Sequence, residues 1–296
     1  MNSKRMTLMH TTEDCEIHHG VRGDEFASFI KTILSHGKLK SHYITELTKP
    51  ENLEHFSTAF TAASANTSRN SEVFEQLGDL CINKFIVQYM YRRFPELNCP
   101  DGVKVVARLR INLGSKQSFY EIGEKLEFWK YISASVYERY KNMKALIEDA
   151  FEAFFGCTEF IVDSMFRPGV GFGVAYQVLE SIFNEIPISL QFEDLYDAKT
   201  RLKEIFDTFG DKLGKLEYQE DRNNSILTSS VFMVKGRSRQ FLGRGSAALK
   251  ANAQQKAAKS AIVAVEKLGY RREEAEFYRK LAKTYPCDAP RPFDDT

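Results

Sequence analysis

The sequence has few of the features that mark a secreted, membrane-spanning or zinc-binding protein. No run of about 18 uninterrupted apolar residues, the length that crosses a membrane, occurs in it. The N-terminal residues lack the apolar core of a signal peptide. Its five cysteines are scattered, and none forms a CxxC or Cys/His pair with zinc spacing: Cys15, Cys81, Cys99, Cys157 and Cys287. We therefore expect reduced thiols in an intracellular compartment, cytoplasm or nucleus, and no membrane partner.

Net charge is also nearly absent, at +1 over 296 residues, and the hydrophobic and charged fractions of 43% and 27% are those of an ordinary globular protein. The length predicts about two domains. The charge is unevenly distributed, because residues 236–259 contain six basic residues and no acidic one. A solvated helix face would account for such a stretch, and so would a surface that binds a polyanion.

Two pairs of carboxylates stand out against this background. Glu75 and Asp79 are four residues apart in a predicted helix, and Asp149 and Glu152 are three apart in another. Residues at these spacings share one helix face. Their apolar neighbours predict that both faces are partly buried. Pairs of this kind can be solvated helix faces, but two buried pairs brought together would need a cation, and oxygen-only ligands favour Mg²⁺ or Mn²⁺.

Hydrophobic periodicity predicts a mainly α fold with one β-containing domain. Residues 103–113 suit a helix or a strand, and the helical surroundings favour a helix. Near residue 196 the pattern changes to a helix, three alternating segments with a hairpin turn at Lys235-Gly236, and an Ala-rich helix. The predicted order is a polar tail, an all-helical domain, a linker, an α-β-β-β-α domain and a charged tail, over residues 1–21, 22–186, 187–195, 196–270 and 271–296.

The acidic segments resemble the motifs of a known family. Residues 71–79 (Ser-Glu-Val-Phe-Glu-Gln-Leu-Gly-Asp) resemble the ribonuclease III signature Asn-Glu-x-Leu-Glu-Phe-Leu-Gly-Asp. Residues 149–156 resemble that family's second acidic motif, Asp-x-x-Glu-Ala-x-x-Gly, and residues 59–64 are similar to its Ala-Phe-Thr-His-x-Ser segment. The three segments follow in the family's order. Several are also similar to the forms that large DNA viruses carry.

The second predicted domain carries a resemblance of its own. Residues 197–204 look like the opening helix of the double-stranded-RNA-binding domain that follows in those enzymes. Residues 243–245 and 253–258 are similar to its last loop and helix. On this resemblance the residues that contact RNA are Thr200, Glu204, Lys250, Gln254 and Lys256. The loop of this domain that usually reads Gly-Pro-x-His is replaced around Asn223–Ser229, which implies weaker contact with RNA.

The resemblance implies a specific chemistry. Glu75, Asp79, Asp149 and Glu152 fall on the family's metal-binding positions, with Asp79 and Glu152 catalytic. They would support Mg²⁺-dependent hydrolysis of double-stranded RNA, leaving 5′-phosphate and 3′-hydroxyl ends with short 3′ overhangs. The family forms homodimers, and the resemblance implies that Phe74 and Gln76 contact the partner subunit.

Two other functions suit the same fold. The chain could be a catalytically silent protein that sequesters double-stranded RNA, as a silencing suppressor would. It could also be a structural protein of a large ribonucleoprotein. A pure binding protein has no need of four crowded carboxylates, so the acid quartet favours an enzyme.

Overall fold

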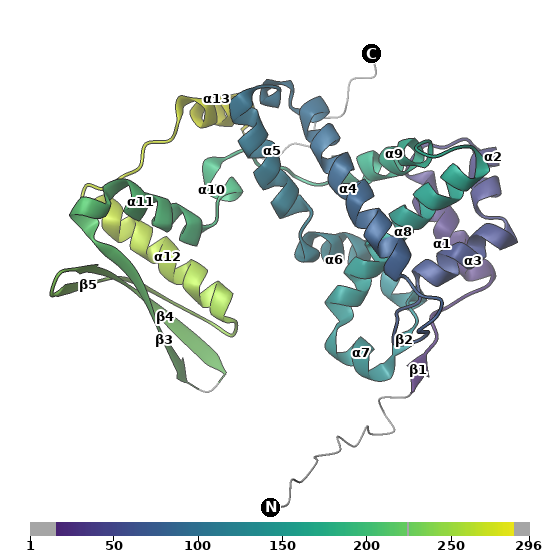
Figure 1. Cartoon of the computed structure of the whole chain (residues 1–296), viewed down its shortest axis with the longest axis horizontal. Coiled ribbons are helices and arrows are strands. Elements are labelled where there is room, and N and C mark those ends of the chain that lie inside the picture. Colours follow the sequence, from purple (N-terminus) through teal and green to yellow (C-terminus); the bar gives the residue numbers. More distant parts are fainter. Residues whose placement is uncertain (1–15, 224, 287–296) are drawn as a thin grey trace, which may run out of the picture. The chain divides into compact units, whose positions relative to one another are not determined.

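The computed structural model describes residues 16–223 and 225–286 of the chain, which divides into two compact units with the boundary between Pro187 and Ile188. Most of the described residues are helical, so the predicted mainly α fold is confirmed (Figure 1). In the described part of the chain, no helix is both long and apolar enough to cross a membrane.

The first unit is built from helices around one long helix pair. Its elements are β1 (Ile17–His18), α1 (Asp24–Ser35), α2 (Ser41–Leu47), α3 (Pro50–Ala59), α4 (Glu72–Arg93), the short 3₁₀ helix η2 (Pro95–Leu97), α5 (Pro100–Leu113), α6 (Lys116–Lys125), η3 (Phe128–Tyr131), β2 (Ala134–Ser135), α7 (Val136–Lys141), α8 (Met143–Met165) and α9 (Gly171–Asn184). Residues 103–113, which suited either state, are therefore helical, because they continue the helix that Pro100 opens.

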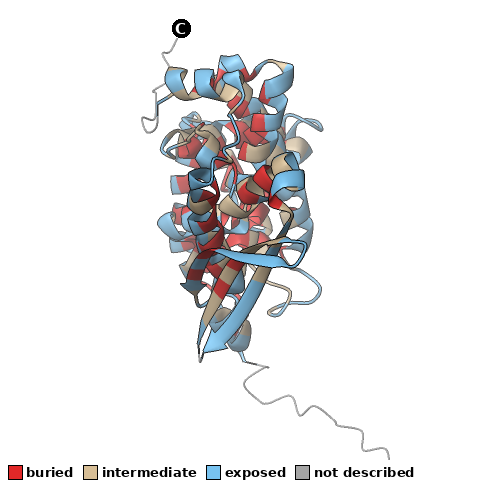
Figure 2. Ribbon diagram, turned by 90° about the vertical axis from the view of Figure 1, so that its left-hand side faces the viewer, coloured by how far each residue is buried: buried red, intermediate tan, exposed pale blue. Residues whose placement is uncertain are grey.

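Helix α8 forms the centre of the first unit. Fourteen of its residues are buried, so it is covered on most sides by its neighbours. Figure 2 shows that buried residues gather in the interior of the fold and exposed residues on its outside. Phe151, Phe154 and Phe155 pack edge-on and tilted against one another and against the rings of neighbouring helices. Such aromatic packing stabilises a core beyond the area it buries. The free thiols of Cys81 and Cys157 are buried in this core.

A single residue separates helix α7 from helix α8. The chain ends α7 at Lys141 and starts α8 at Met143, with Asn142 between them at φ −122°. Asn is a weak helix former that favours helix boundaries. The interruption therefore reorients the chain just before the second acidic motif.

The beginning of the described chain is tied to the segment that precedes α7. Strand β1 pairs antiparallel with β2. The amide of Gly20 donates to Ser133 Oγ at 2.9 Å, and Arg22 donates to the carbonyl of Tyr131 at 2.6 Å. Residues 16–21 thus belong to the folded unit, and the predicted polar tail over residues 1–21 is too long. Local periodicity does not report a pairing between segments more than 100 residues apart.

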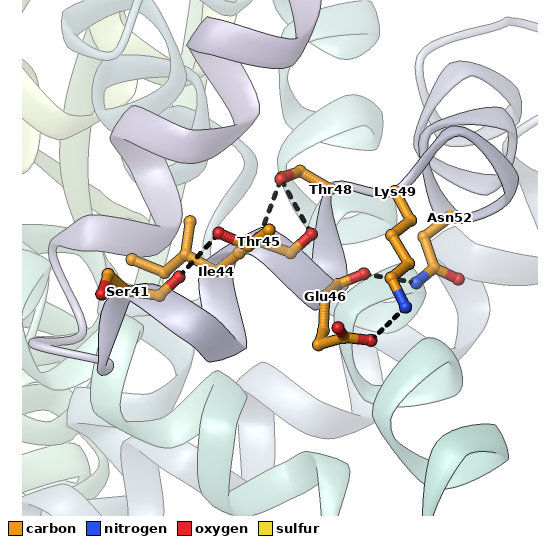
Figure 3. A network of polar contacts seen from close by, with 7 residues as sticks. All are labelled: Ser41, Ile44, Thr45, Glu46, Thr48, Lys49 and Asn52. Carbon is orange, nitrogen blue, oxygen red and sulfur yellow. Dashed lines mark hydrogen bonds and ion pairs between the residues drawn. The ribbon is translucent and has the colours of Figure 1, made fainter.

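Side-chain hydrogen bonds and an ion pair hold the turn between α2 and α3 (Figure 3). Thr48 Oγ1 donates to the carbonyl of Ile44 at 2.8 Å, and Asn52 Nδ2 donates to the carbonyl of Glu46 at 2.9 Å. Lys49 lies 2.6 Å from the Glu46 carboxylate. These bonds add to the backbone bonds that Thr48 and Lys49 already donate to the carbonyls of Ile44 and Glu46 at the end of α2.

The second unit is a three-stranded antiparallel sheet with two helices on one face (Figure 1). Its elements are α10 (Phe192–Leu195), α11 (Ala198–Leu213), β3 (Lys215–Asn223), β4 (Ile226–Lys235), β5 (Ser238–Ala247), α12 (Lys250–Lys267) and α13 (Glu276–Thr284). Its core joins Leu202 and Phe206 of α11 with Val231 of β4 and Ala257 and Ala261 of α12.

Two loops expected in this unit are strand instead. Residues 243–245 continue β5, because α12 lies directly on them: a Cβ at Gly243 would overlap the backbone of Ala261, and one at Gly245 that of Ala257. Glycine permits this close approach. Strand β4 begins at Ile226, which is in register with Asn223, so most of the loop expected around Asn223–Ser229 is also strand.

The segments expected to be a linker and a tail contain packed helices. The ring of Phe192 in α10 lies 5.2 Å from that of Tyr278 in α13, and the hydroxyls of Tyr196 and Tyr278 are 3.0 Å apart. Helix α13 therefore packs against the segment that enters the second unit. The far end of the predicted tail, residues 287–296, lies outside the described residues.

Candidate active site

Helices α4 and α8 cross with their backbones in contact. A Cβ at Gly78 of α4 would overlap the carbonyl oxygen of Glu152, and one at Gly156 of α8 would overlap that of Phe74. Each acidic pair lies next to one of these glycines, because Glu75 and Asp79 flank Gly78 and Glu152 precedes Gly156 by one turn. The two glycines therefore bring the two acidic faces together.

The four acids predicted from the sequence lie within each other's electrostatic field. Glu152 is 7% exposed, and burial raises its pKa to about 8, with further contributions from Glu148, Asp79, Glu75 and Asp149. Burial also raises the pKa of Asp149 to about 7, with Glu75 and Glu148 adding to the shift. The pKa of Glu75 is raised too, first by burial and then by Glu148. Proximity of like charges and burial both disfavour the ionised form.

A fifth carboxylate, Glu148, belongs to this group and was not predicted. It is 5% exposed and lies 2.8 Å from the ammonium group of Lys116 on α6. Lys116 also lowers the pKa of Glu75 and Asp149, so its charge acts on acids of both helices. The sequence did contain a signal, because Glu148 and Glu152 are four residues apart on α8.

The donor chemistry of this group fits a hard divalent cation, because every candidate ligand is a carboxylate oxygen. The raised pKa values point the same way, since a cation would relieve the repulsion that causes them. Within residues 16–223 and 225–286, however, no three His, Cys, Asp or Glu side chains are already gathered closely enough to hold a metal ion. Asp79 instead accepts a bond from Asn83 Nδ2 at 2.7 Å, and Glu148 is held by Lys116. The acids are therefore close enough to interact electrostatically, but their side chains are not arranged as the ligands of a metal ion.

The RNA-contact residues expected in the second unit are held by partners within the chain. Lys250 lies 2.7 Å from the carboxylate of Glu220 on β3, and Gln254 donates to the same carboxylate. Thr200 Oγ1 donates to Asp197 at 2.7 Å, as part of the N-terminal cap of α11. Glu220 therefore joins two of the expected residues at one edge of the unit.

Two further expected residues lie elsewhere. Lys256 donates to the carbonyl of Ser246 at 3.2 Å, beside the end of β5. Glu204 forms an ion pair with Arg272, in the segment between α12 and α13. Lys199 was not predicted to contact RNA. It donates to Gln254 at 2.6 Å and therefore lies in the same group as Lys250 and Gln254.

Comparison with known proteins identifies the family. The sequence profile of the Ribonuclease III domain matches residues 72–159, which run from the start of α4 into α8. A protein named putative ribonuclease 3 from Invertebrate iridescent virus 6 is 40% identical over 260 residues, covering 83% of this chain and 89% of that protein. One of the same name from Frog virus 3 (isolate Goorha) is 37% identical over 237 residues, covering 79% of this chain and 62% of that protein. Ribonuclease 3 of Streptococcus pneumoniae (strain CGSP14) is 30% identical over 239 residues, covering 76% and 94%.

These matches, together with the helical fold and its acidic crossing, define an endoribonuclease. The chain belongs to the ribonuclease III family, as its two acidic motifs indicated. The family in general depends on a divalent metal ion.

Proposed function

We propose that the chain cleaves double-stranded RNA with Mg²⁺, or Mn²⁺, held by Glu75, Asp79, Asp149 and Glu152. The observation that carries this proposal is the meeting of the two acidic pairs where α4 and α8 cross, with the pKa of Asp149 and Glu152 raised to about 7 and 8. Carboxylates crowded in this way favour binding of a cation between them.

The reaction is hydrolysis of a phosphodiester. Water attacks phosphorus and the bond to the 3′ oxygen breaks, so that the products are a 5′-phosphate and a 3′-hydroxyl. Bound cation supplies Lewis acidity at the phosphate and lowers the pKa of the attacking water. The charge of Asp79 on α4 contributes to the raised pKa of Glu152 on α8, and we assign these two residues the roles closest to the reacting phosphate. Asp79, which accepts a hydrogen bond from Asn83, would have to release that bond in order to hold a cation.

Cuts on both strands require two active centres, and an exposed apolar stripe supports a homodimer. Val73, Leu77 and Leu80 lie along one side of α4 and are 68%, 40% and 64% exposed. An apolar stripe on a signature helix is suited to a second copy of the chain. Gln76 is exposed beside this stripe, whereas Phe74 is buried against Phe160 of its own chain, so the expectation that Phe74 contacts the partner is wrong. Offset cuts by two subunits would leave short 3′ overhangs.

We propose that the second unit binds double-stranded RNA, chiefly through Lys250, Gln254 and Thr200. Lys250 is the first residue of α12, where the helix dipole adds to its positive charge. Lys256 and Glu204, which lie apart from these three residues, would add separate contacts. Recognition by shape and phosphate contacts suits a duplex RNA, whose bases are hard to reach.

One gel experiment tests the proposal. The full chain is incubated with end-labelled long double-stranded RNA in Mg²⁺ or in EDTA, and we expect cleavage only with Mg²⁺. Glu152→Gln should abolish cleavage while leaving RNA binding nearly intact, and Glu51→Gln, an exposed acid on α3, should cut normally. Equal cleavage by Glu152→Gln would overturn the assignment. The silent binding protein and the structural protein both predict no cleavage by any of the three.

A further inference from the structure

A cleft in the first unit is lined by three lysines. It has a volume of about 510 Å³ and lies where the N-terminal turns of α6 and α8 meet the end of α7. The side chains that define it are Lys116, Gln117, Tyr120, Lys141, Lys144 and Glu148. We call it the lysine cleft. Neither acidic motif includes a lysine of this cleft, and the expected RNA contacts all lie in the second unit.

The charge of the lysine cleft is positive and largely available. Among its lining residues, Glu148 is the one acid, and it is paired with Lys116. Lys144 donates to the neutral side-chain amide of Gln117 at 3.3 Å, and its ammonium group lies 4.9 Å from the Tyr120 ring centroid. Lys141 donates to the hydroxyl of Tyr137. Because these partners are neutral, the charges of Lys141 and Lys144 remain available to an anion.

The lysine cleft adjoins the acidic group. Glu148 lines the cleft and directly precedes Asp149 on α8. Its carboxylate is almost completely buried, whereas the side chain of Lys116 is 78% exposed. Glu148 therefore holds the ammonium group of Lys116, and with it a positive charge, at the boundary between the acidic residues and the lysine cleft. A polyanion that places one phosphate at the acids would bring a neighbouring phosphate to the lysines.

We propose that the lysine cleft binds the phosphodiester backbone of the RNA strand that is being cut, at phosphates next to the scissile one. Lys141 and Lys144 contact the backbone, and Glu148 is a positioning residue that holds Lys116 at the entrance. This inference rests on the proposed function, since it assigns a second RNA contact to the same enzyme. It explains why positive charge gathers on the unit that also carries the carboxylates.

The test compares two double variants of the full chain, both in the Glu152→Gln background so that RNA is not consumed. One carries Lys141→Gln and Lys144→Gln. The matched control carries Lys31→Gln and Lys40→Gln, which remove two exposed lysines, one on α1 and one immediately before α2. Binding to a fluorescent RNA hairpin is measured by anisotropy between about 50 and 300 mM salt, and the melting temperature of each variant checks its fold.

Each lost phosphate contact lowers the slope of log affinity against log salt by about 0.7–0.9, so the cleft variant should lose about 1.5 from its slope and bind on the order of tenfold more weakly. The control should match the parent. In the cleavage-competent chain, the cleft variant should raise KM by a similar factor and leave kcat within about twofold.

The outcomes separate this inference from the proposed function. If the unaltered chain fails to cut RNA in Mg²⁺, the proposed function fails, whatever the binding slopes are. If the unaltered chain cuts RNA, but the cleft variant has the same salt dependence of binding and the same KM as the control variant, the lysine cleft is not an RNA site. A cleft variant that loses kcat at unchanged KM would also overturn the inference, because it would place these lysines in the chemical step.

Discussion

Gly78 of α4 and Glu152 of α8 meet with their backbones in contact, so that no Cβ fits at position 78. Glu152, which we propose to be catalytic, is therefore positioned by its close contact with Gly78, a residue that has no side chain. The geometry of the acidic group depends on this contact as much as on the acids themselves.

Gly78→Ala should therefore damage both stability and activity. The added methyl group must push α4 away from α8, and overpacking of this kind costs typically 1–3 kcal/mol of unfolding free energy. Urea denaturation and a cleavage assay measure the two effects. Gly173→Ala on α9 is the control, because a Cβ there has nothing within 4 Å and should stabilise the helix by about 0.5–1 kcal/mol. A Gly78→Ala chain as stable and active as the parent would contradict the close crossing.

The stability of the metal-free chain should fall as pH rises. The pKa of Asp149 is about 7 and that of Glu152 about 8 in the folded chain, above the values of about 4 in an unfolded one. The folded chain thus binds more protons than the unfolded chain between about pH 4 and 8, and its unfolding free energy decreases across that window.

Mg²⁺ should reverse this trend, because it binds the ionised carboxylates. We expect the melting temperature in EDTA to fall between about pH 5 and 8, and the increase on adding Mg²⁺ to be larger at the higher pH. In the double variant Asp149→Asn, Glu152→Gln, the fall of the melting temperature with pH should become smaller, and so should the pH dependence of the Mg²⁺ effect. A metal effect of equal size in that variant would place the cation elsewhere.

Removing Lys116 should leave Glu148 buried without its cation. Lys116→Ala is expected to lower the unfolding free energy by about 1–3 kcal/mol, with the exposed position of the lysine favouring the lower end. Glu148→Gln should recover part of this loss in the double variant, because the amide needs no counter-charge. Lys104→Ala, which removes an ion pair with exposed Asp101, should cost under about 1 kcal/mol. Strictly additive effects of Lys116→Ala and Glu148→Gln would show that the pair is not coupled.

A charge on the apolar stripe of α4 should separate the subunits. Leu80→Lys places an ammonium group at a position that is 64% exposed in the single chain, so the fold is expected to survive. Burying that charge in a dimer is unfavourable. Light scattering after size exclusion should report a monomer for Leu80→Lys and a dimer for the parent. Ile111→Lys on α5, 54% exposed, is the matched control and should remain dimeric.

Neutralising Glu220 should strengthen RNA binding. This carboxylate holds both Lys250 and Gln254, so it competes with a phosphate for them. Exposed ion pairs of this kind are weak, so Glu220→Gln should tighten the affinity by no more than a few fold. Glu217→Gln, on the opposite face of β3 and paired with Arg239, should have little effect. Unchanged or weaker binding by Glu220→Gln would show that Lys250 does not contact RNA.

The features that could be predicted are those that a short stretch of the sequence determines. The spacing of Glu75 with Asp79 and of Asp149 with Glu152 sets each pair on one helix face, and the structure brings the pairs together. Glycines next to these acids were read as parts of a motif, but their physical role is the contact between helices, which involves residues about 75 positions apart. Such a role cannot be derived from periodicity.

The incorrect predictions have one cause, which is contact between residues that are far apart in the sequence. Gly243 and Gly245 indicate a loop when their neighbours in sequence alone are considered, and they are strand because α12 lies on them. Phe74 was expected at a subunit interface, and it is buried because Phe160 of α8 covers it. Lys116 was passed over, since only the fold places α6 beside α8. In each case tertiary contact overrides the local preference.

The tie between the start of the described chain and residues 131–135 has a consequence for biosynthesis. Strand β1, Gly20 and Arg22 have partners that are made more than 100 residues later. Contacts of such sequence separation form late and slow the folding of a domain. During translation, β1, Gly20 and Arg22 must therefore wait without these partners until residues 131–135 have left the ribosome, and the first unit completes its fold only after its central helix α8 has followed.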